Sequence, residues 1–107
     1  MSEPRIEHVE ATASAEEIST ILERDGCVII DRLLSEAFCD RVLDDLHPWM
    51  SKVPEGDGEW LGFKTRRTHG LVAKSPAVRE NLCNPLILDI LERVIGPWCD
   101  SFQLSSS

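Results

Sequence analysis

The stretch LERDGCVIIDRLLSEAFCDRVLDDL, residues 22–46, places an acidic turn, a short apolar run and an amphipathic segment in direct succession. Asp25-Gly26 is a typical end of a helix, because glycine readily adopts the left-handed conformation that follows the last helical turn. The β-branched run at residues 27–30 then predicts a short strand, buried on both faces or at the edge of a sheet. Ser35 is the expected N-cap of the next helix. The front of the chain is therefore predicted to run helix, strand, helix.

The helix after Ser35 is defined by a stripe of apolar side chains that faces acidic and basic ones on the opposite side. The stripe consists of Phe38, Val42, Leu46 and Met50, widened by Cys39 and Leu43. This spacing indicates an amphipathic helix with one face against a core. We expect it to end near His47, because Pro48 cannot extend the hydrogen-bond ladder.

The N-terminus divides into an arm and a short capped helix. Residues 1–13 are polar and without period, so they are expected to form a flexible arm. Ser14 and Glu17 match a capping box, in which the serine hydroxyl accepts from a backbone N–H three residues on. Residues 14–107 are expected to form one folded part that begins with this helix.

Residues 51–62 hold proline, three glycines and several acids, which predicts a surface loop. Trp60 and Phe63 lie at its far end. Two interpretations stay open: these aromatics pin the loop to a core, which is favoured, or the loop closes over a ligand.

Two further helices are expected where a capping residue precedes proline. One begins after Ser75 and ends near Cys83, and the other begins after Asn84 and ends at Ile95. Asp89 and Arg93 can pair across one turn of the second helix. The tail then alternates, with Trp98, Phe102 and Leu104 on one side, which is typical of a half-buried strand.

The bulk properties exclude several classes of function. A formal net charge of -8 disfavours generic binding to nucleic acids or anionic membranes. The four cysteines form no C-x-x-C pair, so they are expected to be buried or half-buried thiols in a reducing compartment. No signal segment opens the chain and no apolar run is long enough to cross a bilayer, so the sequence predicts a soluble, cytoplasmic protein.

No catalytic or metal-binding residue is assigned from motifs. The three histidines form no H-x-D, H-E-x-x-H or H-x-x-H motif, and neither a phosphate-binding loop nor a nucleophile motif occurs. The segment KTRRTHG, residues 64–70, is the only basic concentration. In a strand, Arg66 and Arg67 would point to opposite faces, one towards a carboxylate and one towards solvent. The alternative is that both are exposed and balance an acidic surface.

The order of these elements resembles a known family. The segments ILERDGCVIIDRLLSEAFCDRVLDDL and KTRRTHGLVAKSPAVRENLCNPLILDILERVIGPWCDSFQLSSS are similar to the N-terminal portion of the phytanoyl-CoA dioxygenase family, and the resemblance spans residues 18–107. It implies an α+β fold made of the N-terminal helices and first strands of a double-stranded β-helix, a cupin-like jelly roll, which is incomplete in this chain. It also implies Fe(II) and 2-oxoglutarate as cofactors and a small organic molecule as substrate.

The resemblance assigns no iron ligand to this chain, because the family's H-x-D pair, second histidine and 2-oxoglutarate-binding arginine come later. The chain is therefore expected to be an N-terminal part that ends before the H-x-D and is inactive by itself. Candidate contacts to 2-oxoglutarate or substrate are Arg66, Arg67, Thr68, Gln103 and Ser105.

Two other interpretations stay open. The first is a non-enzymatic interaction module, whose amphipathic helices pack together or dock a partner. The second is a degraded or wrongly delimited gene product, which would associate with itself through exposed apolar side chains and an unpaired strand edge.

Overall fold

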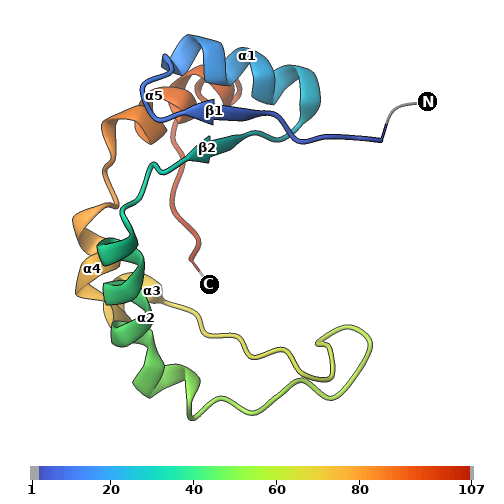
Figure 1. Cartoon of the computed structure of the whole chain (residues 1–107), viewed down its shortest axis with the longest axis vertical. Helices are drawn as coiled ribbons and strands as arrows, with labels where there is room; N and C mark the ends of the chain where they lie inside the picture. Colours follow the sequence, from blue (N-terminus) through green and yellow to red (C-terminus); the bar gives the residue numbers. More distant parts are fainter. Residues whose placement is uncertain (1–2, 107) are drawn as a thin grey trace. The chain divides into compact units, whose positions relative to one another are not determined.

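A computed structural model describes residues 3–106. Its elements are β1 (His8–Glu10), α1 (Ala15–Asp25), β2 (Ile29–Asp31), α2 (Glu36–Met50), α3 (Leu71–Lys74), α4 (Pro76–Glu80), α5 (Pro85–Val94) and the 3-10 helix η1 (Gly96–Trp98) (Figure 1). They form two compact units: residues 3–35 with 83–103, and residues 36–82 with 104–106. The α+β class is confirmed, whereas the mobility of residues 1–13 and the joint folding of 14–107 stay predictions.

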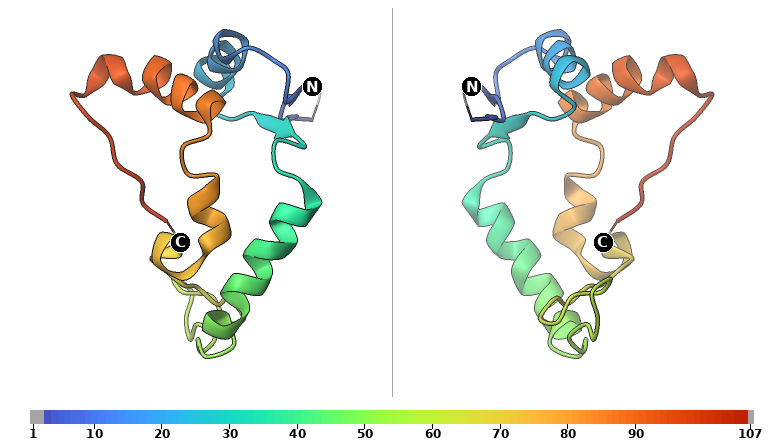
Figure 2. Two further views of the ribbon diagram at one scale, coloured as in Figure 1. Left: turned by 90° about the vertical axis from the view of Figure 1, so that its left-hand side faces the viewer. Right: turned by 90° about the vertical axis from the view of Figure 1, so that its right-hand side faces the viewer.

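The first unit is built on the contact between α1 and α5, which lie side by side in Figures 1 and 2. Its buried apolar side chains are Val9, Ala15, Ile18, Ile21 and Ile90. Ile18 is completely buried, because the apolar side of α1 faces the apolar side of α5. These two amphipathic helices therefore supply most of the core.

The sheet of the first unit has two parallel strands. β1 pairs with β2 in a register that places Val9 beside Ile30, and α1 is the crossover that a parallel connection needs. His8 Nδ1 lies 2.7 Å from Asp31 Oδ1 across the pair. One expectation needs correction: β2 begins two residues later than predicted. Of the two predicted settings, the one at the edge of a sheet is confirmed, because β1 is the only strand that pairs with β2 among residues 3–106. A strand also forms before Ser14, where the sequence pattern indicated no regular element.

Three predicted helix caps of this unit are confirmed: Ser14, Gly26 and Asn84. Ser14 Oγ accepts from the N–H of Glu17 at 3.1 Å, and Gly26 takes φ 79° at the end of α1. Asn84 Oδ1 accepts from the first N–H groups of α5, and Arg93 Nε donates to Asp89 at 2.9 Å. Each contact joins residues close in sequence, which is why the pattern alone predicted it.

The second unit packs α2 against α3 and α4. The expected stop of α2 at His47 is wrong, since the helix continues through Pro48 to Met50. Pro48 lacks the N–H of a helical residue and its ring crowds the preceding turn, but near a helix end the following turn still closes: the N–H of Ser51 donates to the carbonyl of His47 at 3.0 Å. The stripe from Phe38 to Met50 is half-buried.

Three further expectations are corrected. Residues 64–70 form no strand, and they are followed by the short helix α3, which the sequence did not predict. The tail forms no strand either, because the only paired strands among residues 3–106 are β1 and β2. Trp98 lies in η1, and 87% of its surface is exposed. α4 ends at Glu80 rather than Cys83.

All four cysteines are exposed rather than buried. On α2, Cys39 and Leu43 lie outside the half-buried stripe, because only one side of this helix meets α3 and α4. Among the described helices, none combines the length and the apolar character needed to cross a bilayer.

Candidate functional site

A groove of about 570 Å³ lies in the second unit between the end of α2, the segment before α3, and α3 itself. Its apolar floor is formed by Leu43, Leu46, Met50 and Leu71. The three α2 residues recur at spacings of three and four, which brings their side chains onto one face of the helix. The volume is in the range of small-molecule sites in proteins.

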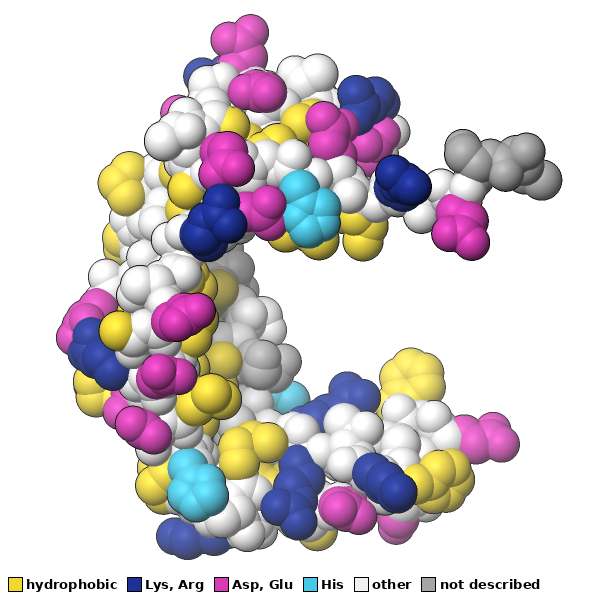
Figure 3. Space-filling model, in the orientation of Figure 1, with side chains coloured by type: hydrophobic (Ala, Val, Ile, Leu, Met, Phe, Trp, Pro, Cys, Tyr) yellow, Lys and Arg dark blue, Asp and Glu magenta, His cyan; other side chains and the backbone are white. Residues whose placement is uncertain are grey.

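The polar rim of the groove is basic. It consists of His47, Arg66, Arg67 and Thr68. Arg66 and Arg67 are exposed, and neither makes an ion pair or side-chain hydrogen bond among residues 3–106. Figure 3 shows Lys and Arg side chains next to hydrophobic ones around the end of α2 and the following loop. The rim therefore offers two guanidinium groups that form no ion pair with a carboxylate of residues 3–106.

Thr68 anchors the rim to α3. Its side chain is buried, with 8% of the residue exposed, and its hydroxyl accepts a hydrogen bond from Lys74 Nζ at 2.5 Å. The Lys74 ammonium also lies 5.1 Å from the centroid of the Trp49 ring, a cation–π contact. Because the hydroxyl oxygen accepts from lysine, its own O–H is free to donate to a ligand in the groove.

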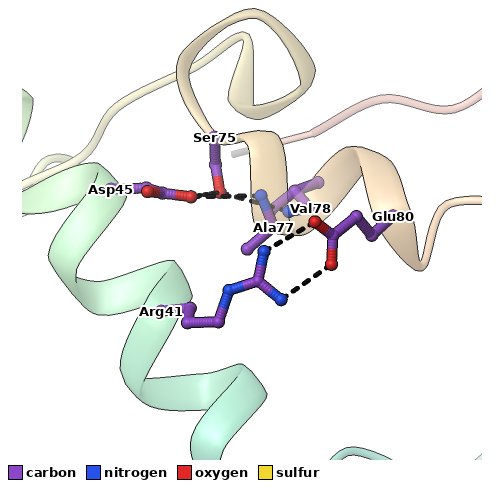
Figure 4. Close-up of polar contacts among 6 residues, drawn as sticks. All are labelled: Arg41, Asp45, Ser75, Ala77, Val78 and Glu80. Atoms are coloured by element: carbon purple, nitrogen blue, oxygen red, sulfur yellow. Dashed lines mark hydrogen bonds and ion pairs between the residues drawn. The ribbon is translucent and has the colours of Figure 1, made fainter.

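A polar clasp holds α2 against the start of α4 (Figure 4). Asp45 Oδ2 accepts from Ser75 Oγ at 2.8 Å and from the N–H of Ala77 at 3.1 Å. Ser75 is completely buried and caps α4, since its Oγ also accepts from the N–H of Val78. This clasp, together with α3, keeps the two sides of the groove in place.

The clasp includes a second, more exposed contact. Both terminal nitrogens of Arg41 donate hydrogen bonds to the carboxylate of Glu80, at 2.7 and 2.6 Å. The N–H of Ala77 and the hydroxyl of Ser75 lower the pKa of Asp45, and the Arg41 guanidinium lowers the pKa of Glu80. Both carboxyl groups are therefore held in the charged form.

The loop before the groove presents its aromatics to solvent. The N–H of Gly56 donates to Thr65 at 3.0 Å and the N–H of Gly62 donates to Gly58 at 2.6 Å, so the backbone closes on itself. Trp60 is 91% exposed and Phe63 is 69% exposed. The favoured interpretation, in which these side chains pin the loop to a core, is wrong for this structure, because the loop is closed by its own backbone bonds.

Three of the five candidate residues line the groove: Arg66, Arg67 and Thr68. Gln103 is an exposed residue of the first unit and Ser105 an exposed residue of the second, and neither lines the groove. Sequence reasoning missed the contribution of α2, although the spacing of Leu43, Leu46 and Met50 carried the signal: it was interpreted as core, and only the packing shows that this face is partly open.

The described residues do not fit an iron centre. A facial triad needs two histidines and one carboxylate converging on one point, and no group of three histidine, cysteine or acidic side chains among residues 3–106 converges in that way. The basic rim, in contrast, suits a carboxylate, because guanidinium groups bind carboxylates through charge-assisted hydrogen bonds.

Comparison with known proteins finds fungal dioxygenases. The sequence is 33% identical over 89 residues to the dioxygenase swnH2 of Arthroderma benhamiae, covering 81% of this chain and 28% of that protein. It is 32% identical over 100 residues to the multifunctional dioxygenase prhA of Penicillium brasilianum, covering 90% and 33%. It is 27% identical over 117 residues to the Fe(II)/2-oxoglutarate-dependent dioxygenase nvfF of Aspergillus novofumigatus, covering 99% and 39%.

These matches concern the N-terminal region of the relatives. The chain spans about a third of the length of the curated relatives it matches. No protein-family profile matches the sequence. The chain is therefore a distant relative of the N-terminal region of fungal Fe(II)/2-oxoglutarate-dependent dioxygenases.

Proposed function

We propose that this chain forms the N-terminal part of a non-haem Fe(II)/2-oxoglutarate-dependent dioxygenase of the phytanoyl-CoA dioxygenase type, which oxidises a small organic substrate. The observation that carries the proposal is the similarity to proteins named as dioxygenases, which extends over 81% to 99% of the chain. The part of the resemblance that concerns α1, β2, α2 and α5 agrees with the elements of the structure, whereas the strands it implies at residues 64–70 and in the tail do not form among residues 3–106.

In this proposal, the chain supplies a ligand-facing wall and no iron ligand. The wall is the groove of the second unit, where Arg66, Arg67 and Thr68 present cations and a hydroxyl. The clasp between Asp45 and Ser75 holds α2, which lines the groove, against the start of α4. The iron ligands belong to a part of the double-stranded β-helix that residues 3–106 do not include, which agrees with the share of the relatives that the chain covers.

A chimera tests this proposal. The N-terminal third of prhA is replaced by the present chain, and consumption of 2-oxoglutarate is measured with and without added Fe(II). We expect iron-dependent consumption above that of prhA lacking its N-terminal third, because the related region restores the missing wall. Circular dichroism of both proteins controls for folding. A folded chimera that is no more active than the truncated protein would refute the proposed function.

A further inference from the structure

The groove pairs an apolar floor with cations that have no acidic partner. Most arginines outside it are engaged: Arg24, Arg32, Arg41 and Arg93 each form an ion pair with a carboxylate. Arg66 and Arg67 form none within residues 3–106, although the protein has nineteen acidic residues to offer. Unpaired guanidinium groups beside an apolar surface have the geometry and the charge to bind a carboxylate or phosphate that comes from outside the chain.

Thr68, the third polar residue of the rim, also favours an anionic ligand. Thr68 is the buried residue of the rim and accepts a hydrogen bond from Lys74, whose side chain has no carboxylate partner among the described residues. This pairing brings a third positive charge beside the groove and leaves the Thr68 O–H as a donor. Donors and positive charge surround the rim, so its chemistry favours an acceptor that is negatively charged.

The apolar floor of the groove disfavours a small polar dianion as the only ligand. Leu43, Leu46, Met50 and Leu71 would stay in contact with water if 2-oxoglutarate alone lay on the rim. Burial of apolar surface contributes roughly 25 cal/mol per Å² to binding, so a ligand with an apolar body gains from the floor as well as from the rim. A molecule that satisfies both needs an apolar body and an anionic group.

We propose that the groove binds an organic substrate with an apolar body and a carboxylate near one end. That the ligand is a substrate rests on the proposed function. In this inference the carboxylate binds Arg66 and Arg67, and the apolar body packs on the floor of the groove. Arg67 also borders a smaller groove that contains Glu55 and Asp57, so Arg66 is the more readily available of the two cations.

The test uses the 107-residue chain and a fluorescent probe, a dansyl-labelled undecanoate, compared with its methyl ester. Both probes have the same apolar body, and only the first carries a charge. We expect saturable binding with the carboxylate about tenfold tighter than the ester, because each of two exposed ion pairs changes a binding constant by up to about fivefold. Decanoate should displace the probe, whereas an equal concentration of 2-oxoglutarate should not.

Three double or single variants locate the two contributions. Arg66→Gln with Arg67→Gln should remove the preference for the carboxylate and leave binding of the ester unchanged. Lys52→Gln with Lys64→Gln is the matched control, since it removes the same charge from residues outside the groove lining. Leu43→Ser should weaken both probes, because Leu43 belongs to the floor and its side chain is largely exposed.

Equal affinity for carboxylate and ester on the unaltered chain would overturn the inference, whatever the variants do. Displacement by 2-oxoglutarate as effective as by decanoate would also overturn it. Binding needs neither iron nor turnover, so an active chimera with no discrimination refutes this inference alone. An inactive folded chimera with clear discrimination refutes the proposed function and leaves an anion-selective groove.

Discussion

The buried hydroxyl of Ser75 gives the sharpest prediction for the second unit. The change is Ser75→Ala, which removes a side chain that caps α4 and donates to Asp45 at 2.8 Å. Loss of an N-cap serine lowers the free energy of unfolding by about 1 kcal/mol. Asp45 keeps its hydrogen bond from Ala77 and is partly open to water, so the loss of its other contact adds less.

The assay is urea denaturation followed by the fluorescence of Trp49. Trp60 and Trp98 are replaced by phenylalanine, which is tolerable because both are largely exposed, and Trp49 then reports on the second unit alone. At a denaturant slope of about 2 kcal/mol per molar urea, the loss of about 1 kcal/mol lowers the midpoint by about 0.5 M.

Ser51→Ala is the matched control, because Ser51 is exposed and its hydroxyl donates only to the carbonyl of Pro48. It should lower the midpoint by less than Ser75→Ala does. If both variants shift the midpoint equally, Ser75 does not hold α4 in the way the structure describes.

Two further predictions concern acid stability and the core of the first unit. Asp45 has a lowered pKa in the folded state, so the folded chain binds fewer protons than the unfolded one; the resulting stability is present at neutral pH and is lost as the pH falls below about 4. Asp45→Asn should therefore flatten the acid side of the Trp49 midpoint profile, and an unchanged slope would contradict this. Ile18→Ala should lower the free energy of unfolding of the first unit by about 2 to 5 kcal/mol, because Ile18 is completely buried between α1 and α5. Leu88→Ala, at a partly exposed position of α5, is its control in denaturation followed by circular dichroism, and comparable losses would refute the assignment of the core.

The helix boundaries that the sequence predicted correctly are those set by local chemistry. Ser14, Gly26, Ser75 and Asn84 each act on backbone groups within a few residues, through a side-chain oxygen or a left-handed turn. Such contacts form wherever the chain folds into a helix, so a residue and its near neighbours are enough to predict them. Pro48 is the exception, because the effect of a proline depends on how close the helix end is.

Pairings between residues distant in the sequence could not be predicted from local sequence patterns. β1 meets β2 across the whole of α1, and nothing in the residues around Val9 shows that a partner lies twenty-one positions ahead. The tail illustrates the reverse case: Trp98, Phe102 and Leu104 alternate as a strand would, yet no neighbouring strand among residues 3–106 takes their hydrogen bonds. Alternation indicates what a segment can do in a sheet, whereas the sheet itself requires a second segment.

Part of the candidate site could be predicted from local sequence, and part depended on the packing of distant segments. The sequence by itself determined the basic segment at Arg66 and Arg67 and the apolar stripe that includes Leu46 and Met50. Only the tertiary structure decided that the two face one groove, because Asp45 and Ser75 join α2 to α4 and so bring residues 66–68 beside the end of α2. Residue types and spacing are local properties of a chain, whereas a binding surface depends on which distant segments pack together and which faces they leave open.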